Sequence, residues 1–255
     1  MVHQPSETYL PIGVHRGEYQ LTRKAKADNI IAILKSQLGD LSSKSALDFG
    51  CHQGFMTIHL ASAFHDTIGV DRESGLIAAA RQLKTDSKLV FQTCTGNRLP
   101  FMDGVFDVII ANHVLYYVED PRFTLCEFHR LMKDDSICFV SGINGHYTKL
   151  TSLLPERLRS WILRTFLKAS LNTGNSISYD RYLSLFEDFD ILDFSTAVMK
   201  NPETYARDSS GFHKFLLFLL SHIPQRLLKC LTRYSPTFLF ILRKKNIHQQ
   251  AEASR

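Results

Sequence analysis

The residues with the clearest chemical potential are two glycines and one aspartate. Gly50 and Gly54 enclose a short turn between an apolar stretch at 45–49 and the first turns of an expected helix. Such a strand–turn–helix unit gathers backbone N–H groups and the positive end of a helix at one point, which favours a nucleotide-like ligand. About twenty residues later an apolar run ends in Asp71, whose carboxylate could accept both hydroxyls of a ribose. The pattern predicts a nucleoside site, although glycine turns also close helix–strand packing in proteins that bind nothing.

Three further segments follow in order along the chain, at 89–93, 99–111 and 113–121. Together with the glycine turn they resemble the class I S-adenosylmethionine-dependent methyltransferases, in the branch that includes quinone and other small-molecule methyltransferases. The resemblance covers about residues 46–141, and residues 237–243 look like the last strand of that family. It implies S-adenosyl-L-methionine as cofactor and methyl transfer to a small molecule.

The resemblance also implies where the cofactor is held. The strand end and the glycine turn would hold the methionine part, Asp71 would bind the ribose, and Arg72 would lie beside the adenine. Thr95 could hydrogen-bond the adenine amino group, and the segment after the fourth strand would approach the sulfonium and the amino group. The expected cofactor contacts are Asp48, Gly50, Cys51, His52, Gly54, Asp71, Arg72, Thr95, Gly96 and Asn112.

Two positions depart from the family's pattern. His52 stands where the family usually has the middle glycine, so its ring could crowd the methionine moiety. The segment 94–97 lacks the aspartate that the family often carries there, and the Thr95 hydroxyl would make a weaker contact than a carboxylate. Both departures bear on how well the cofactor would bind.

The expected chemistry needs little acid or base help, because a positively charged sulfur is already a good leaving group. The protein must mainly align the reacting atoms and exclude water. If a general base is used, His113 is the first candidate and His146 the second, since both follow strand ends. The two acids have structural alternatives: Asp48 could cap a strand end, and Asp71 could cap the following helix.

Apolar strand patterns alternate with amphipathic helices, which indicates a parallel sheet covered on both faces. We expect an α/β fold, a Rossmann-like, doubly wound, mostly parallel seven-stranded sheet with helical cap insertions. A single domain would span 1–255. Its expected parts are an N-terminal arm and helix (1–44), a cofactor-binding core (45–142), cap insertions with the sixth strand (143–235), the last strand (236–243) and a tail (244–255).

The segments 146–171 and 212–231 combine Leu and Phe, and in the first a Trp, with Arg and Lys. This composition could line a pocket for a lipid-like acceptor or rest on an anionic membrane surface. The simpler alternative is that these apolar faces pack on the core and on each other. Membrane contact is therefore one of two interpretations.

Composition narrows the function classes further. The chain of 255 residues is 44% hydrophobic and carries a formal charge of +5, with no long basic block, so nucleic acid is an unlikely partner. Its five scattered cysteines show no paired metal-ligand spacing, and neither a secretory signal nor a spanning helix is visible. We expect a small-molecule acceptor, no metal and a cytoplasmic location.

Three rival functions stay open from the sequence. A non-catalytic nucleotide-fold protein, serving as a binding or assembly partner, is suggested by His52 and by the missing acid near Thr95. A nicotinamide-dependent reductase shares the glycine turn and the strand-end acid, but the segment 99–107 argues against it. An RNA methyltransferase lacks support from any basic stripe or added RNA-binding module.

Overall fold

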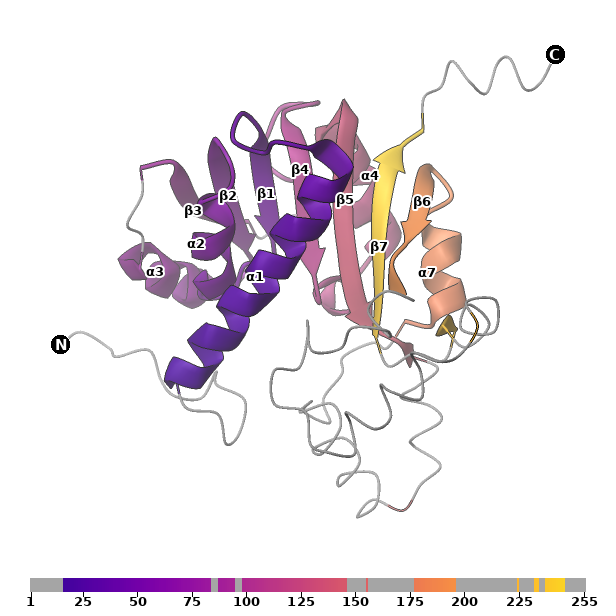
Figure 1. The fold of residues 1–255 in the computed structure, drawn as a ribbon, viewed down its shortest axis with the longest axis horizontal. Helices are drawn as coiled ribbons and strands as arrows, with labels where there is room; N and C mark the ends of the chain where they lie inside the picture. Colours follow the sequence, from indigo (N-terminus) through magenta and orange to yellow (C-terminus); the bar gives the residue numbers. More distant parts are fainter. Residues whose placement is uncertain are drawn as a thin grey trace.

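A seven-stranded sheet forms the centre of the protein (Figure 1), with strand order β3-β2-β1-β4-β5-β7-β6. The computed structural model describes residues 16–83, 87–94, 98–145, 155, 177–195, 224, 232–233 and 237–245. All strand pairs are parallel except those of β7, which runs antiparallel to β5 and to β6. The strands are β1 (Ser45–Phe49), β2 (Asp66–Asp71), β3 (Leu89–Thr93), β4 (Phe106–Asn112), β5 (Met132–Ile143), β6 (Phe189–Asp193) and β7 (Thr237–Lys244).

The chain order reverses between β1 and β4, where β2 and β3 extend the sheet to one side and β5 to the other. In sheets of this kind ligands bind beyond the carboxyl ends of the strands at that reversal. The predicted doubly wound, mostly parallel sheet is confirmed. The glycine turn after β1 and the segment after β4 both lie at the reversal.

Helices cover both faces of the sheet. They are α1 (Arg16–Leu38), α2 (Phe55–Ala61), α3 (Ser74–Leu83), the short 3₁₀ helix η2 (Leu115–Tyr117), α4 (Pro121–Leu131) and α7 (Tyr179–Leu185). In Figure 1, α1 crosses one face of the sheet and α4 lies on the other. Alternate residues of β4 enter different cores: Val108 and Ile110 pack with α1 and α2, while Ile109 packs with α4 and α7. Burial on both faces explains the unbroken apolar pattern of the strands.

Helix α4 leads into strand β5 without a loop between them. Helix α4 begins at Pro121 because Asp120 caps it, accepting hydrogen bonds from Arg122 N at 2.9 Å and Phe123 N at 3.0 Å. Strand β5 begins at Met132, directly after the last residue of α4, and Met132 pairs with Phe106 of β4 before the register shifts.

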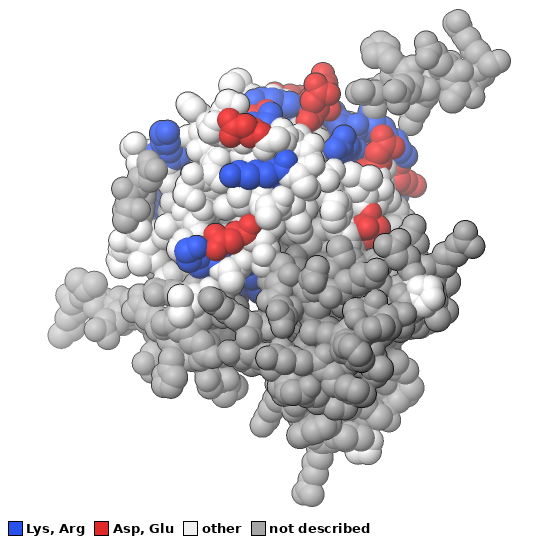
Figure 2. Space-filling model, viewed as in Figure 1, with Lys and Arg blue, Asp and Glu red and all other residues white. Residues whose placement is uncertain are grey.

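The two expected cap segments, 146–171 and 212–231, lie outside the described residues except for their two prolines. The cap and the division of the chain into parts therefore stay predictions. On the described part of the face drawn in Figure 2, Lys and Arg are interspersed with Asp and Glu. Among the described residues, no helix has both the length and the apolar character that a membrane span requires.

Candidate active site

The turn after β1 requires glycine at both of its ends. Gly50 and Gly54 have φ angles of 78° and 76°, in the left-handed region that side chains rarely adopt. A Cβ on Gly50 would come 2.4 Å from Val114 Cγ2, and a Cβ on Gly54 would come 2.5 Å from Phe91 Cζ. The turn therefore packs directly against β3 and against the segment that follows β4.

The backbone amides of this turn are largely used inside the protein. Gly50 N and Cys51 N donate to Val70 O at 2.8 and 2.9 Å, and Gly54 N donates to Cys51 O at 3.0 Å. His52 N donates to a carboxylate oxygen of Asp71 at 2.9 Å. The expectation that these amides are available to a ligand is thus wrong for these four groups. Three of them tie the turn to the end of β2, and the fourth, Gly54 N, closes the turn on itself.

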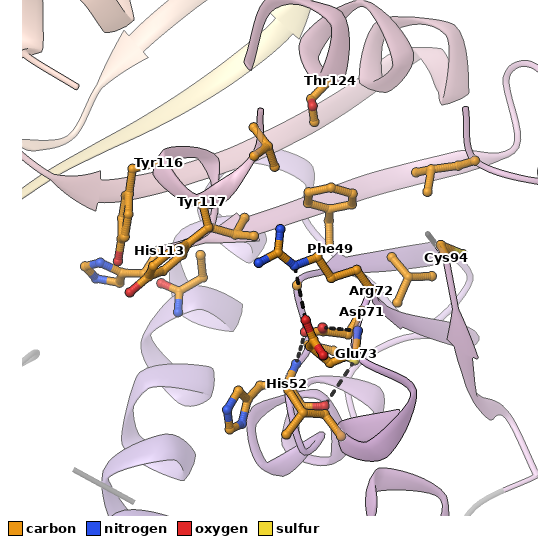
Figure 3. A pocket seen from close by; sticks show the side chains of 18 of the residues that line it. Phe49, His52, Asp71, Arg72, Glu73, Cys94, His113, Tyr116, Tyr117 and Thr124 are labelled. Carbon is orange, nitrogen blue, oxygen red and sulfur yellow. Dashed lines mark hydrogen bonds and ion pairs between the residues drawn. The ribbon is translucent and has the colours of Figure 1, made fainter. Parts of the chain in front are cut away.

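Asp71 ends β2 and lines the same cavity as the turn (Figure 3). One carboxylate oxygen accepts from His52 N at 2.9 Å and the other from Glu73 N at 3.0 Å. The second contact fixes the loop before α3, but it is a turn contact and not a helix cap, because Glu73 precedes the helix, which begins at Ser74. A carboxylate offers about four acceptor sites, so two remain for ligand hydroxyls.

Asp48 lies beneath the turn, 1% exposed, and is not among the residues that line the cavity. Its Oδ2 accepts a hydrogen bond from Thr57 Oγ1 at 2.6 Å. Burial raises the pKa of Asp48 to about 7, opposed by the Thr57 hydrogen bond. In the structure Asp48 ties β1 to α2, and its expected contact with the methionine part stays a prediction.

Two histidines, His52 and His113, flank the reversal with left-handed backbones, at φ of 54° and 56°. Such conformations cost about 1–3 kcal/mol at non-glycine residues and gather at functional sites. In Figure 3 the His52 ring extends to the opposite side of its backbone from the Asp71 carboxylate. The ring lines the cavity without filling the space beside that carboxylate.

His113 is a weak base in this environment. Burial, together with the charges of Lys26 and Arg23, lowers the pKa of His113 to about 3. Its ring lies near Tyr116, with ring centroids 6.4 Å apart (Figure 3). A neutral imidazole can shape the acceptor side of the cavity, but this pKa disfavours proton abstraction at neutral pH. The second candidate base, His146, lies outside the described residues.

Asn112, the last residue of β4, is held in one orientation. Its Oδ1 accepts a hydrogen bond from Ser141 Oγ at 2.7 Å, and its Nδ2 faces Met56 Sδ at 3.6 Å. The side chain lines the cavity beside the turn. Asn144, the residue after β5, is fully buried. Its Nδ2 donates to Arg233 O at 2.8 Å and its Oδ1 accepts from Tyr179 N at 3.2 Å, so its side chain holds these segments together.

These features surround one cavity of about 730 Å³, within the range of small-molecule cofactor sites. Thr95 and Gly96 lie outside the described residues, while Asp48 and Gly54 support the turn without lining the cavity. The residues from the sequence-based set that do line it are Gly50, Cys51, His52, Asp71, Arg72, Asn112 and His113.

The sequence pattern did not identify Arg23 of α1 as a cavity residue. Its charge acts on Asp48, His52 and His113, which places it over the ends of β1 and β4. Tyr116 and Tyr117 of η2 also line the cavity, with ring centroids 4.5 Å apart and ring planes tilted by 49°. The spacing of residues in the sequence predicts which residues of α1 share a face. It does not predict which strands of the sheet that face will cover.

Comparisons with known proteins agree with this geometry. A family model described as "Methyltransferase domain" matches residues 47–140. Ubiquinone biosynthesis O-methyltransferase of Pseudomonas aeruginosa is 31% identical over 107 residues, which cover 41% of this chain and 46% of that protein. Residues 47–140 of this chain therefore carry a methyltransferase domain. This segment contains the turn, Asp71 and the end of β4.

Two more distant proteins match over longer stretches of this chain. Malonyl-[acyl-carrier protein] O-methyltransferase of Bacillus cytotoxicus is 22% identical over 223 residues, covering 78% of this chain and 77% of that protein. A solved structure of Haemonchus contortus phosphoethanolamine N-methyltransferase 2 with S-adenosyl-L-methionine has a TM-score of 0.55 at 16% identity, covering 86% of this chain and 53% of that one. The chain spans about half the length of the first curated relatives it matches.

The site residues fit S-adenosylmethionine, the cofactor of this family. Asp71 keeps two acceptor positions for the ribose hydroxyls, and the His52 ring leaves the space beside it open. Arg23 supplies a positive charge over the strand ends that suits the carboxylate of an amino-acid tail. No group of three or more His, Cys, Asp or Glu in the described part of the chain is arranged to hold a metal ion.

Proposed function

We propose that this methyltransferase binds S-adenosylmethionine in the 730 Å³ cavity and methylates a small, apolar or lipid-like acceptor. The observation that supports it most is the pairing of Asp71 with the Gly50–Gly54 turn through the hydrogen bond from His52 N. That bond holds a strand-end carboxylate against a glycine turn at the sheet reversal. Bound S-adenosylmethionine supplies a methyl group already activated by a positively charged sulfur.

The residues of the cavity then have separate tasks. Asp71 accepts the ribose hydroxyls, and Arg23 pairs with the carboxylate of the cofactor. Asn112, held by Ser141, orients the amino-acid end through its amide. His113, half-buried, and Tyr116, buried, form the wall at the end of β4, where their rings exclude water from the acceptor.

The nature of the acceptor draws support from the relatives. The Pseudomonas aeruginosa relative is named for ubiquinone biosynthesis and for methylation at oxygen. The aromatic wall of Tyr116 and Tyr117 suits a flat or apolar molecule of that kind. Transfer to oxygen of a small molecule is therefore the part of the proposal that the relatives favour.

Calorimetric titration with S-adenosylhomocysteine, the demethylated product, tests cofactor binding directly. We expect measurable heat and a raised melting temperature, because a ligand that binds only the folded state stabilises it. NADH serves as the control ligand and should produce neither effect. Absence of heat with both the cofactor and its product would favour the non-catalytic alternative, and binding of NADH instead would favour a reductase.

Approach of the acceptor from a membrane surface is a separate part of the proposal, and it rests on the composition of 146–171 and 212–231. The test is cosedimentation with vesicles of anionic phospholipid at low salt, with neutral vesicles as the control. Equal recovery in the supernatant with both kinds of vesicle would remove the membrane part and leave the cofactor site unaffected.

A further inference from the structure

Leu99 is held in the cavity wall by a hydrogen bond to a buried acid. Leu99, Glu127 and Phe128 all line the cavity, and Leu99 and Glu127 are 4% and 6% exposed. Leu99 N donates to Glu127 Oε1 at 2.8 Å. Because Glu127 belongs to α4, this bond ties the segment before β4 to the helix that follows it.

Arg130, about one turn further along α4, completes the attachment. Its guanidinium has five N–H donors, and each of them has an acceptor. Nε donates to Glu127 Oε2 at 2.9 Å, while Nη2 donates to Glu127 Oε1 and, at 3.2 Å, to Leu99 O. Nη1 donates to Phe101 O at 2.9 Å and to Asp103 Oδ1. Glu127 and Arg130, the α4 ion pair, therefore bind both the N–H and the C=O of Leu99.

The α4 ion pair is shielded from water. The side chains of Arg130 and Glu127 are 18% and 7% exposed, whereas those of Arg122 and Glu187, a second pair that involves α4, are 60% and 53% exposed. Hydrogen bonds from Arg130 lower the pKa of Glu127, and the bond from Leu99 N adds to their effect against that of burial. A buried charge that loses its partner is strongly destabilised, whereas an exposed pair contributes little. The α4 ion pair is therefore the one that can fix the cavity wall.

The proposed position of the cofactor leaves one end of the cavity for the base. Asp71 is the proposed contact of the ribose, and Asn112, at the end of β4, is the proposed contact of the amino-acid end. Figure 3 shows Cys94 on the opposite side of Asp71 from His113, the residue after β4. Cys94 and Leu99 both line the cavity and belong to, or pack against, the same apolar cluster. The base of the cofactor would then lie beside Leu99.

We propose that Glu127 and Arg130 are positioning residues for the cofactor, which hold Leu99 against the base of bound S-adenosylmethionine. The inference rests on the proposed function and concerns the base end of the same cavity. A wall that is ordered before the ligand arrives loses little conformational freedom on binding, so affinity is higher. Because the α4 ion pair acts through Leu99, its removal should weaken only those ligands that carry the base.

The test compares two ligands that differ in the base. S-adenosylhomocysteine carries adenine, and S-ribosylhomocysteine has the same ribose and amino-acid tail without a base. Calorimetric titration is carried out on the unmodified full-length protein, on Glu127→Gln and on the control Glu187→Gln, which alters the exposed pair with Arg122. Glutamine has the size of glutamate but carries an N–H donor in place of one oxygen, so Arg130 or Leu99 N loses an acceptor.

We expect Glu127→Gln to weaken S-adenosylhomocysteine about tenfold or more, which corresponds to about 1.4 kcal/mol or more, and S-ribosylhomocysteine less than about twofold. Glu187→Gln should change neither affinity by more than about twofold. An equal loss with both ligands would show a general effect on the fold and would overturn the inference, as would an unchanged affinity of Glu127→Gln for S-adenosylhomocysteine. Failure of S-adenosylhomocysteine to bind the unmodified protein would instead contradict the proposed function.

A double-variant cycle with S-adenosylhomocysteine alone tests whether Glu127 acts through Leu99. Leu99→Ala should weaken this ligand about as much as Glu127→Gln does. The double variant should lie within about twofold of the weaker single variant, because both substitutions remove the same contact. Additive losses would overturn the inference, since Glu127 would then act by a route that excludes Leu99. If Glu127→Gln does not fold, Arg130→Lys takes its place in the cycle, because lysine keeps the charge and loses the forked hydrogen bonds.

Discussion

The Asp71→Asn substitution tests the ribose contact with the least change in shape. In the structure two of the about four acceptor positions of the carboxylate are used by His52 N at 2.9 Å and Glu73 N at 3.0 Å. Asparagine keeps one oxygen and replaces the other with an N–H donor. Either a backbone amide or a ribose hydroxyl then loses its acceptor.

The substitution is expected to lower both the stability of the fold and the affinity for S-adenosylhomocysteine. Loss of one hydrogen bond to a half-exposed carboxylate should lower the free energy of unfolding by about 1–2 kcal/mol. Loss of a hydroxyl contact should weaken S-adenosylhomocysteine about 10- to 100-fold, which corresponds to about 1.4–2.7 kcal/mol. Urea unfolding measures the first effect and calorimetric titration measures the second.

Asp66→Asn is the matched control, because Asp66 begins the same strand at its opposite end and its one ion-pair partner among the described residues is the exposed His65, at 2.8 Å. It should change neither quantity by more than about 0.5 kcal/mol. Asp71→Asn should weaken the binding of a cofactor analogue without the 2′-hydroxyl less than it weakens the binding of S-adenosylhomocysteine. If Asp71→Asn binds S-adenosylhomocysteine as tightly as the unmodified protein, Asp71 does not bind the ribose.

Three further predictions concern the turn and the strand ends. Gly54→Ala should lower the free energy of unfolding by about 2 kcal/mol or more, because the left-handed backbone disfavours a side chain and the new Cβ meets Phe91 at 2.5 Å. Gly75→Ala, with nothing within 4 Å, should be neutral or stabilising by up to about 1 kcal/mol, and equal melting temperatures for the two variants would contradict this reasoning. The folded-state pKa of Asp48 is raised to about 7, so its contribution to stability is complete at low pH and is lost as pH rises from about 4 to 7. Asp48→Asn should therefore gain stability relative to the unmodified protein across that range, by about 1.4 kcal/mol per pH unit, and a flat difference in urea unfolding would refute the raised pKa. His113→Asn should leave the pH dependence of S-adenosylhomocysteine binding unchanged between about pH 6 and 9, because an imidazole with a pKa of about 3 does not titrate in that range. Asparagine is chosen because it tolerates the left-handed backbone of this position. If the substitution removed an inflection near neutral pH, His113 would be shown to titrate there.

Local patterns in the sequence were sufficient to predict the architecture and the residues at the centre of the site. Short apolar runs separated by amphipathic helices predict a parallel sheet, and the order of motifs predicts which strand ends carry the ligand. Gly50, Gly54 and Asp71 could be singled out because a tight turn and a strand-end acid depend on residues close together in sequence. The structure confirms the doubly wound sheet and brings Gly50 and Asp71 to one cavity, while Gly54 ends the turn without lining it.

Contacts between segments that are distant in the sequence determine the hydrogen-bond partners and the pKa values of the site residues. The amides of the turn are used because β2 lies beside it, and Asp48 is enclosed because α2 folds back over β1. The position of Arg23 depends on how α1 lies across the sheet, which residue spacing within the helix does not specify. Burial, and with it every shifted pKa at this site, arises only when these elements pack together. The chemistry available at each residue type was therefore readable from the chain, whereas its protonation state and its partners followed from packing.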